Sequence, residues 1–116
     1  MAFKMLDAAT TTGTSAIVYL PYHLTVNEHT VTASFTSGTA VTIAIEGTLD
    51  NRGVADADKK WAALATHVFD ADEITAKFAE FHIANKGVLA VRLNLTTFTT
   101  AGGTLTAKYQ PVYGGC

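Results

Sequence analysis

The chain has few cysteines, few charged residues and no long apolar run, the features that mark many specialised classes of protein. Its 116 residues include one cysteine, Cys116, the last residue, so no disulfide can form within the chain. Charged residues make up 16% of it and the formal net charge is -2, which leaves no basic surface to neutralise phosphates. No apolar run approaches the ~20 residues that span a bilayer, and the opening segment lacks a signal-peptide core. We expect no nucleic-acid or membrane partner, and a protein made in a cytoplasm.

Motifs that carry chemistry are also scarce. The sequence has no Gly-x-Ser-x-Gly elbow, no phosphate-binding loop and no pair of cysteine and histidine. Its histidines are His23, His29, His67 and His82. None has the short spacing that places two imidazoles on one metal, so each is interpreted as a solvated or hydrogen-bonded strand residue. The sequence predicts a protein that is not an enzyme and that needs no cofactor.

The loop after Leu49 is the best place for a hard cation. Asp50, Asp56 and Asp58 supply carboxylate oxygens there, which are the ligands that calcium prefers. Their order does not match the helix-loop-helix calcium pattern, and the turn chemistry of aspartate explains them equally well. We predict no metal, and these three residues are the only candidates for one.

Strand patterns dominate the rest of the chain. Apolar and polar residues alternate with a period of two in the segments 16–20, 30–36, 41–45, 77–83, 88–98 and 104–110. Helical spacing is confined to a short stretch, 70–78, with an acidic start. About seven or eight short strands with glycine-rich turns predict an all-β fold, an antiparallel β-sandwich that is jelly-roll-like, with at most a short helical turn.

Hairpins and a core follow from the same alternation. We expect hairpins over 41–69 and 31–45, and a C-terminal hairpin formed by 88–98 and 104–110. The expected core residues are Val41, Ile43, Ile45, Trp61, Phe81, Leu89, Val91, Leu93 and Leu95.

The two ends of the chain differ from the middle. Residues 1–15 are expected to form an extended N-terminal arm, residues 16–111 the sandwich, and residues 112–116 a C-terminal tail. Apolar and aromatic side chains near these ends are expected to contact a partner; they are Phe3, Met5, Leu6, Tyr22 and Tyr113. Such ends can add a strand to a neighbour's sheet. In the alternative interpretation, they fold back on their own core.

Four pieces of the sequence carry a resemblance to a known family. They are IAIEGTLDNRG, KKWAALATHVFDADE, FHIANKGVLAVRLNLTTFT and GGTLTAKYQP, and together they extend over residues 41–111. This succession of strand ends, a Trp-led strand, an acidic turn and a Phe-His strand resembles the small β-sandwich module of tailed-phage virion proteins. The design is similar to the discoidin-like or jelly-roll design of capsid decoration (cement) proteins and of tail and fibre modules.

The resemblance implies a structural role in a phage particle. The expected function is to decorate and stabilise the capsid by binding across neighbouring capsid subunits, as a homo-oligomer, in a virion assembled in the host cytoplasm. The expected partners are the major capsid protein or other virion proteins. One alternative is a tail, baseplate or fibre accessory protein. Another is a carbohydrate-binding module that uses tyrosine and tryptophan rings to stack on a glycan.

Overall fold

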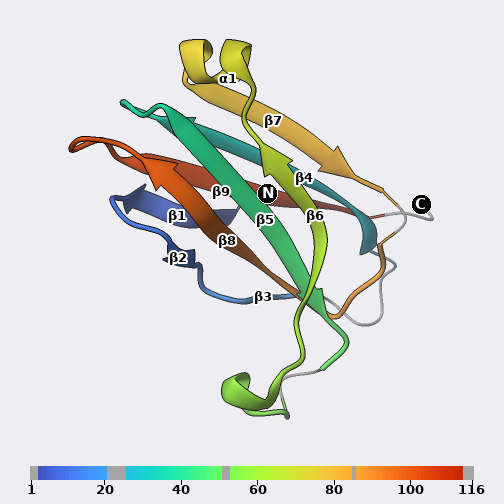
Figure 1. The fold of residues 1–116 in the computed structure, drawn as a ribbon. Coiled ribbons are helices and arrows are strands. Elements are labelled where there is room, and N and C mark those ends of the chain that lie inside the picture. The colour runs from blue at the N-terminus through green and yellow to red at the C-terminus, as the bar shows by residue number, and fades with distance from the viewer. Residues whose placement is uncertain (1–2, 21–25, 51–52, 85, 114–116) are drawn as a thin grey trace.

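The computed structural model describes residues 3–20, 26–50, 53–84 and 86–113. Strands make up most of these residues (Figure 1). They are β1 (Phe3–Ala9), β2 (Gly13–Thr14), β3 (Val18–Tyr19), β4 (Val26–Phe35), β5 (Ala40–Thr48), β6 (Ala62–Val68), β7 (Phe78–Ile83), β8 (Ala90–Thr99) and β9 (Leu105–Tyr113). A 3-10 turn, η1 (Asp56–Asp58), and one short helix, α1 (Ala71–Ala76), complete the described elements.

The strands form two antiparallel sheets that pack face to face. The first sheet has the order β1-β9-β4-β7, and the second has the order β2-β8-β5-β6, with β3 also paired to β8. Consecutive strands change sheets at every step except β2 to β3 and β5 to β6. This is the strand order of a jelly roll, so the predicted fold class is confirmed. In Figure 1 the second sheet, with β5, β6 and β8, lies in front of the first.

One of the three predicted hairpins is present. Strands β5 and β6 pair antiparallel from Thr42 opposite Val68 to Gly47 opposite Ala62. Leu64 is an extra residue in this ladder, because Ala65 pairs with Ile45 and Ala63 pairs with Glu46. Such a bulge bends an edge strand and increases its local twist.

The predictions of the other two hairpins are wrong. Strand β4 lies in the first sheet and β5 in the second, and β8 and β9 are likewise divided between the sheets. Segments 36–39 and 100–104 are therefore crossovers from one sheet to the other. Alternation shows which side chains of a strand face the core. It does not show whether two strands form a hairpin or lie in opposite sheets, because both arrangements turn the apolar faces toward the same core.

These two crossovers lie against each other. The Thr100 hydroxyl donates a hydrogen bond to the Ser37 carbonyl oxygen at 2.7 Å, and the Gly103 N–H donates to the Thr100 hydroxyl oxygen at 2.9 Å. A Cβ atom on Gly103 would lie 2.3 Å from the Ser37 carbonyl oxygen. Only glycine therefore fits at this position of the crossover.

The core lies between the sheets, and most of its predicted members are there. Six of the predicted residues are buried: Val41, Ile43, Ile45, Val91, Leu93 and Leu95. The first sheet contributes residues from β4 and β9 in the same way, among them Val31, Phe35, Leu105 and Tyr109. The remaining predicted core residues, Trp61, Phe81 and Leu89, are only partly buried.

The N-terminal segment differs from the expected arm. Residues 3–9 form β1, which pairs with β9 at the edge of the first sheet, and Met5 and Leu6 are both buried in the core. A register shift between Lys4 and Leu6 lets two consecutive side chains point inward. This shift also breaks the two-residue period, which is why the sequence did not indicate a strand here. At the other end, β9 continues to Tyr113, so residues 112–113 also belong to a strand.

Candidate functional site

The predicted contact residues near the chain ends are separated by the fold. Phe3 is 38% exposed at the edge of the first sheet, and its ring stacks on Tyr109 with a centroid distance of 6.5 Å. Met5 and Leu6 are buried, so their side chains pack in this chain's own core and not at its surface. Tyr22 lies outside the described residues.

Tyr113 is described only through its backbone, which ends β9 opposite Val26 of β4. Its side chain lies outside the described part of the structure. Of the five predicted contact residues, Phe3 is therefore the one whose side chain the structure places at the surface.

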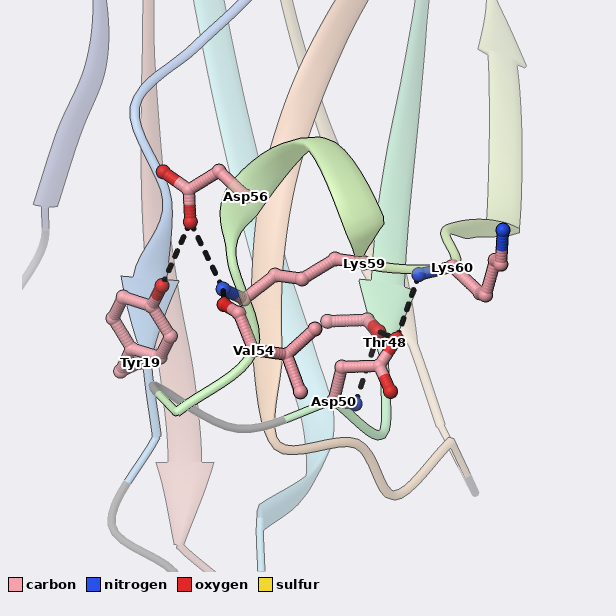
Figure 2. A network of polar contacts seen from close by, with 7 residues as sticks. All are labelled: Tyr19, Thr48, Asp50, Val54, Asp56, Lys59 and Lys60. Atoms are coloured by element: carbon pink, nitrogen blue, oxygen red, sulfur yellow. Dashed lines mark hydrogen bonds and ion pairs between the residues drawn. The ribbon is translucent and has the colours of Figure 1, made fainter.

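The loop between β5 and β6 is held by side-chain hydrogen bonds to its own backbone (Figure 2). The Asp50 carboxylate accepts hydrogen bonds from the Thr48 hydroxyl at 3.2 Å and from the Lys60 backbone N–H at 2.7 Å. The Asp50 N–H in turn donates to the Thr48 hydroxyl oxygen at 3.0 Å. Asp50 thus joins the two ends of the loop and fixes the exit of β5.

A buried lysine organises the middle of the same loop. The Lys59 side chain is fully buried, and its ammonium donates to the Asp56 carboxylate at 2.9 Å and to the Val54 carbonyl oxygen. It also lies 5.3 Å from the centre of the Tyr19 ring, a cation–π contact. The Tyr19 hydroxyl donates to Asp56 at 3.3 Å, so the loop is tied to the segment around β3 (Figure 2).

The charges of this pair stabilise each other. The hydrogen bond from Lys59 lowers the pKa of the Asp56 carboxyl, and the hydrogen bond to Asp56 raises the pKa of the Lys59 ammonium. The cation that Asp56 binds is therefore the chain's own lysine. Asp58 lies exposed on η1, and within the described residues no three carboxylate, histidine or cysteine side chains gather as a metal site.

His29 is buried between the sheets, just before the predicted strand segment 30–36. Its Nδ1 lies 2.6 Å from the Tyr109 hydroxyl oxygen, and its Nε2 lies 2.8 Å from the Lys86 carbonyl oxygen. Because a carbonyl oxygen only accepts, we assign the proton to Nε2, and Nδ1 then accepts from Tyr109. Burial lowers the pKa of the His29 imidazole, and the bond to the Lys86 carbonyl opposes this in part.

His67 closes the edge of the sandwich beside α1. Its ring stacks on Phe81 at 4.6 Å between centroids, and its Nε2 lies 2.9 Å from the Glu73 carboxylate. Glu73 is also part of a capping box with Asp70 at the start of α1. The short helical turn expected over 70–78 is thus present, and its acidic start supplies the caps. His82 is exposed and contacts the Thr30 hydroxyl at 2.9 Å.

Trp61 lies on the outer face of the second sheet rather than in the core. The Arg92 guanidinium is 4.3 Å from the centre of the indole ring, and the Arg92 Nε donates to Glu46 at 2.7 Å. Asn94 donates to the other oxygen of Glu46 at 3.3 Å. The Trp61 Nε1 is buried without a hydrogen-bond partner among the described residues. Because Trp61 precedes β6, strand alternation could not indicate its face.

A hollow of about 400 Å³ lies at the end of the sandwich where β5 ends and β6 begins. Its walls are largely apolar and include Gly47, Leu49, Leu64 and Val88. Among the described residues that line it, no set of side chains suited to nucleophilic or acid–base chemistry converges. Sequence reasoning missed the hollow, because its walls come from segments that are distant in the chain.

No family model matches the chain, and no curated protein matches it either. Among the described residues, no helix combines the length and the apolar composition that crossing a membrane requires.

Proposed function

We propose that the protein is a non-enzymatic structural protein of a phage virion that decorates and stabilises the capsid by binding across neighbouring capsid subunits. One observation carries this proposal. Among the described residues, the side chains best suited to chemistry are held in contacts within the chain, whereas several large apolar side chains are exposed. The internally held groups are Lys59 with Asp56, His29 with Tyr109, His67 with Glu73, and Arg92 with Glu46.

The exposed apolar side chains lie on a rigid body. They are Phe3, Leu49, Val68 and Phe78, at the edges and one end of the sandwich. Burying those that face the capsid, for which Phe3 is the predicted contact residue, releases water and stabilises the contact. Many copies bound to one lattice would add avidity to each weak contact. The partners in this proposal are the major capsid protein or other virion proteins, with copies of this chain beside them as a homo-oligomer.

The structure indicates which variant can test a contact at the N-terminal end. Deleting residues 1–6 would remove most of β1 and the buried side chains of Met5 and Leu6, so lost binding could reflect lost folding. A single change, Phe3→Ser, keeps the strand and its buried residues. Phe78→Ser is the matched control, because Phe78 is 47% exposed at the opposite edge of the first sheet.

The test measures occupancy on particles that lack this protein. Purified wild-type and variant chains are added to such particles, and bound copies are counted after sedimentation. We expect Phe3→Ser to lower occupancy at least tenfold, and Phe78→Ser to bind as the wild type does. Wild-type chains that do not sediment with particles would overturn the proposal. Separating heads from tails in the same experiment distinguishes capsid decoration from a tail, baseplate or fibre role.

The carbohydrate alternative has less support in the geometry. The ring of Trp61 is covered on one face by the Arg92 guanidinium, and the ring of Tyr19 lies beside the Lys59 ammonium. A sugar that stacks on a ring needs an open face. In the described residues, therefore, these two rings do not form a stacking platform together.

A further inference from the structure

The hollow at the end of β5 has an exposed leucine as one of its walls. We call it the end hollow, and its lining includes Gly47, Leu49, Leu64 and Val88, with Asp50 and Lys60 as charged members. Leu49 is 73% exposed, the highest value among the large apolar side chains that the structure describes. Leaving such a side chain in water is unfavourable, so a partner that covers it gains binding energy.

Leu49 is held at the surface by its neighbours in the chain. Thr48 is buried, and the hydrogen bonds of Asp50 to Thr48 and to the Lys60 backbone fix the next residue. Figure 2 shows these anchors together at the end of β5. Leu49 thus lies between two residues that hydrogen bonds hold in place, which limits the entropy that binding would cost.

The shape of the end hollow depends on the glycine at position 47. A Cβ atom on Gly47 would lie 2.8 Å from Val88 Cγ1 and 3.0 Å from Leu64 Cδ1. The absence of a side chain at this position lets Val88 and Leu64 approach the strand and shape the apolar walls. The same end of the molecule therefore carries a projecting apolar side chain and an apolar recess.

We propose that the end hollow is the contact between two copies of this chain related by a two-fold axis, in which Leu49 of each copy enters the hollow of the other. A two-fold contact requires a surface that is complementary to itself. The projecting leucine and the recess lie side by side, so the exchange can be mutual. This proposal does not depend on the proposed function, because it concerns the purified chain alone.

The charges around the end hollow favour a second copy over a partner of one charge. Asp50 and Lys60 both line it, and Figure 2 shows the Lys60 side chain directed away from the buried Lys59. Across a two-fold axis, the carboxylate of one copy can face the ammonium of the other. A partner with a single sign of charge would leave one of them opposed by a like charge.

The test is the association of the full chain in solution, measured by sedimentation equilibrium. Reducing buffer keeps Cys116 from crosslinking copies. We expect the wild type to show a monomer–dimer equilibrium, and Leu49→Asp to raise its dissociation constant by about a hundredfold or more, since each dimer loses two buried leucines. Val68→Asp is the matched control: Val68 is 66% exposed on β6 and does not line the end hollow. It should dimerise as the wild type does.

Lys60→Glu tests the charge pairing separately. The Lys60 backbone, not its side chain, holds Asp50, so the loop should remain intact. We expect this change to weaken the dimer several-fold, and added salt to weaken the wild-type dimer. Unfolding curves for each variant confirm that the fold is kept.

Three results would overturn this proposal. They are a wild type that stays monomeric at millimolar concentration, a Leu49→Asp variant that dimerises normally, and equal weakening by Leu49→Asp and Val68→Asp. A monomeric wild type whose binding to particles requires Leu49 would mean that the end hollow receives another virion protein, which also rejects the second copy. Failure of the capsid role alone would leave the dimer in place.

Discussion

The two ends of the sandwich are closed by different means. At the start of β5, the two crossovers meet through backbone and hydroxyl groups, and Gly103 leaves no room for a side chain. At the end of β5, the long loop is organised by side chains, with Lys59 and Asp50 at its centre. The first end should therefore tolerate no added volume at Gly103, while the second should tolerate it at Gly87 but depend on its charged groups.

The largest expected effect is at the crossover end. A Gly103→Ala change would place a methyl group 2.3 Å from the Ser37 carbonyl oxygen, so the two crossovers must separate. We expect a loss of about 3 kcal/mol or more in the free energy of unfolding, measured by urea denaturation. Gly87→Ala at the other end is the control, because no atom lies within 4 Å of its added Cβ. A similar loss for both changes would mean that the ends do not differ in packing.

Removing the buried ammonium should weaken the loop end next. Lys59→Met keeps the length of the side chain, but it removes the ammonium that donates to the Val54 carbonyl oxygen and leaves Asp56 with only the Tyr19 hydroxyl of its two side-chain donors. We expect a lower midpoint of urea unfolding, by less than Gly103→Ala causes. Asp56→Asn should cost less than Lys59→Met, since Asp56 is exposed and can be solvated. Equal costs would indicate that the ion pair, and not the burial of lysine, stabilises the loop.

Lowering the pH should destabilise the loop end of the sandwich before the crossover end. The folded state holds His29 neutral with a lowered pKa, while the unfolded chain protonates it near the ordinary value of 6.5. As the pH falls, His29 is therefore protonated in the unfolded chain before it is protonated in the folded protein. The stability that neutral His29 contributes is complete above pH 6.5 and decreases as the pH falls toward the lowered pKa of the folded state.

Hydrogen exchange at pH 7.5 and pH 5 measures where this loss occurs. We expect protection to fall first near Lys86, whose carbonyl accepts from His29, and later at the crossovers. A His29→Leu variant should show a smaller change of stability between these two pH values, whereas an exposed control, His82→Asn, should keep the wild-type change. An unchanged pH response in His29→Leu would assign the effect to other groups.

The smallest effect is a gain at the crossover end, where α1 lies. Lys77 ends α1 with φ of 58°, in the left-handed region that favours glycine. Lys77→Gly should raise the free energy of unfolding by up to about 1 kcal/mol, measured by urea denaturation. Ala76→Gly, one residue earlier inside the helix, should lower it by about 0.5–1 kcal/mol. The same sign for both would contradict this interpretation.

The faces of the strands were predictable from sequence, but their partners were not. Ile43 and Ile45 alternate with polar residues, so their burial follows from the period of two. The same alternation did not reveal that β4 and β5 lie in different sheets. That choice depends on contacts such as Thr100 to Ser37, which join segments far apart in the chain.

The candidate sites show the same limit. Extending the alternation of Val31 and Ala33 backward by two residues would have placed His29 on the inner face, so its burial had a signal in the sequence. Lys59 had none, because a lysine beside Lys60 is typical of a solvated loop, and only the folded loop shows which of the two is buried. For Leu49, the sequence pattern indicates only the end of a strand.

The pairing of β1 with β9 has a consequence for how the protein is made. Strand β1 leaves the ribosome before β9, so it must stay without this partner while every strand between them is made. Contacts of such long sequence separation form slowly. Until they form, Met5 and Leu6 are open to wrong partners, and the first sheet closes only after translation has passed β9.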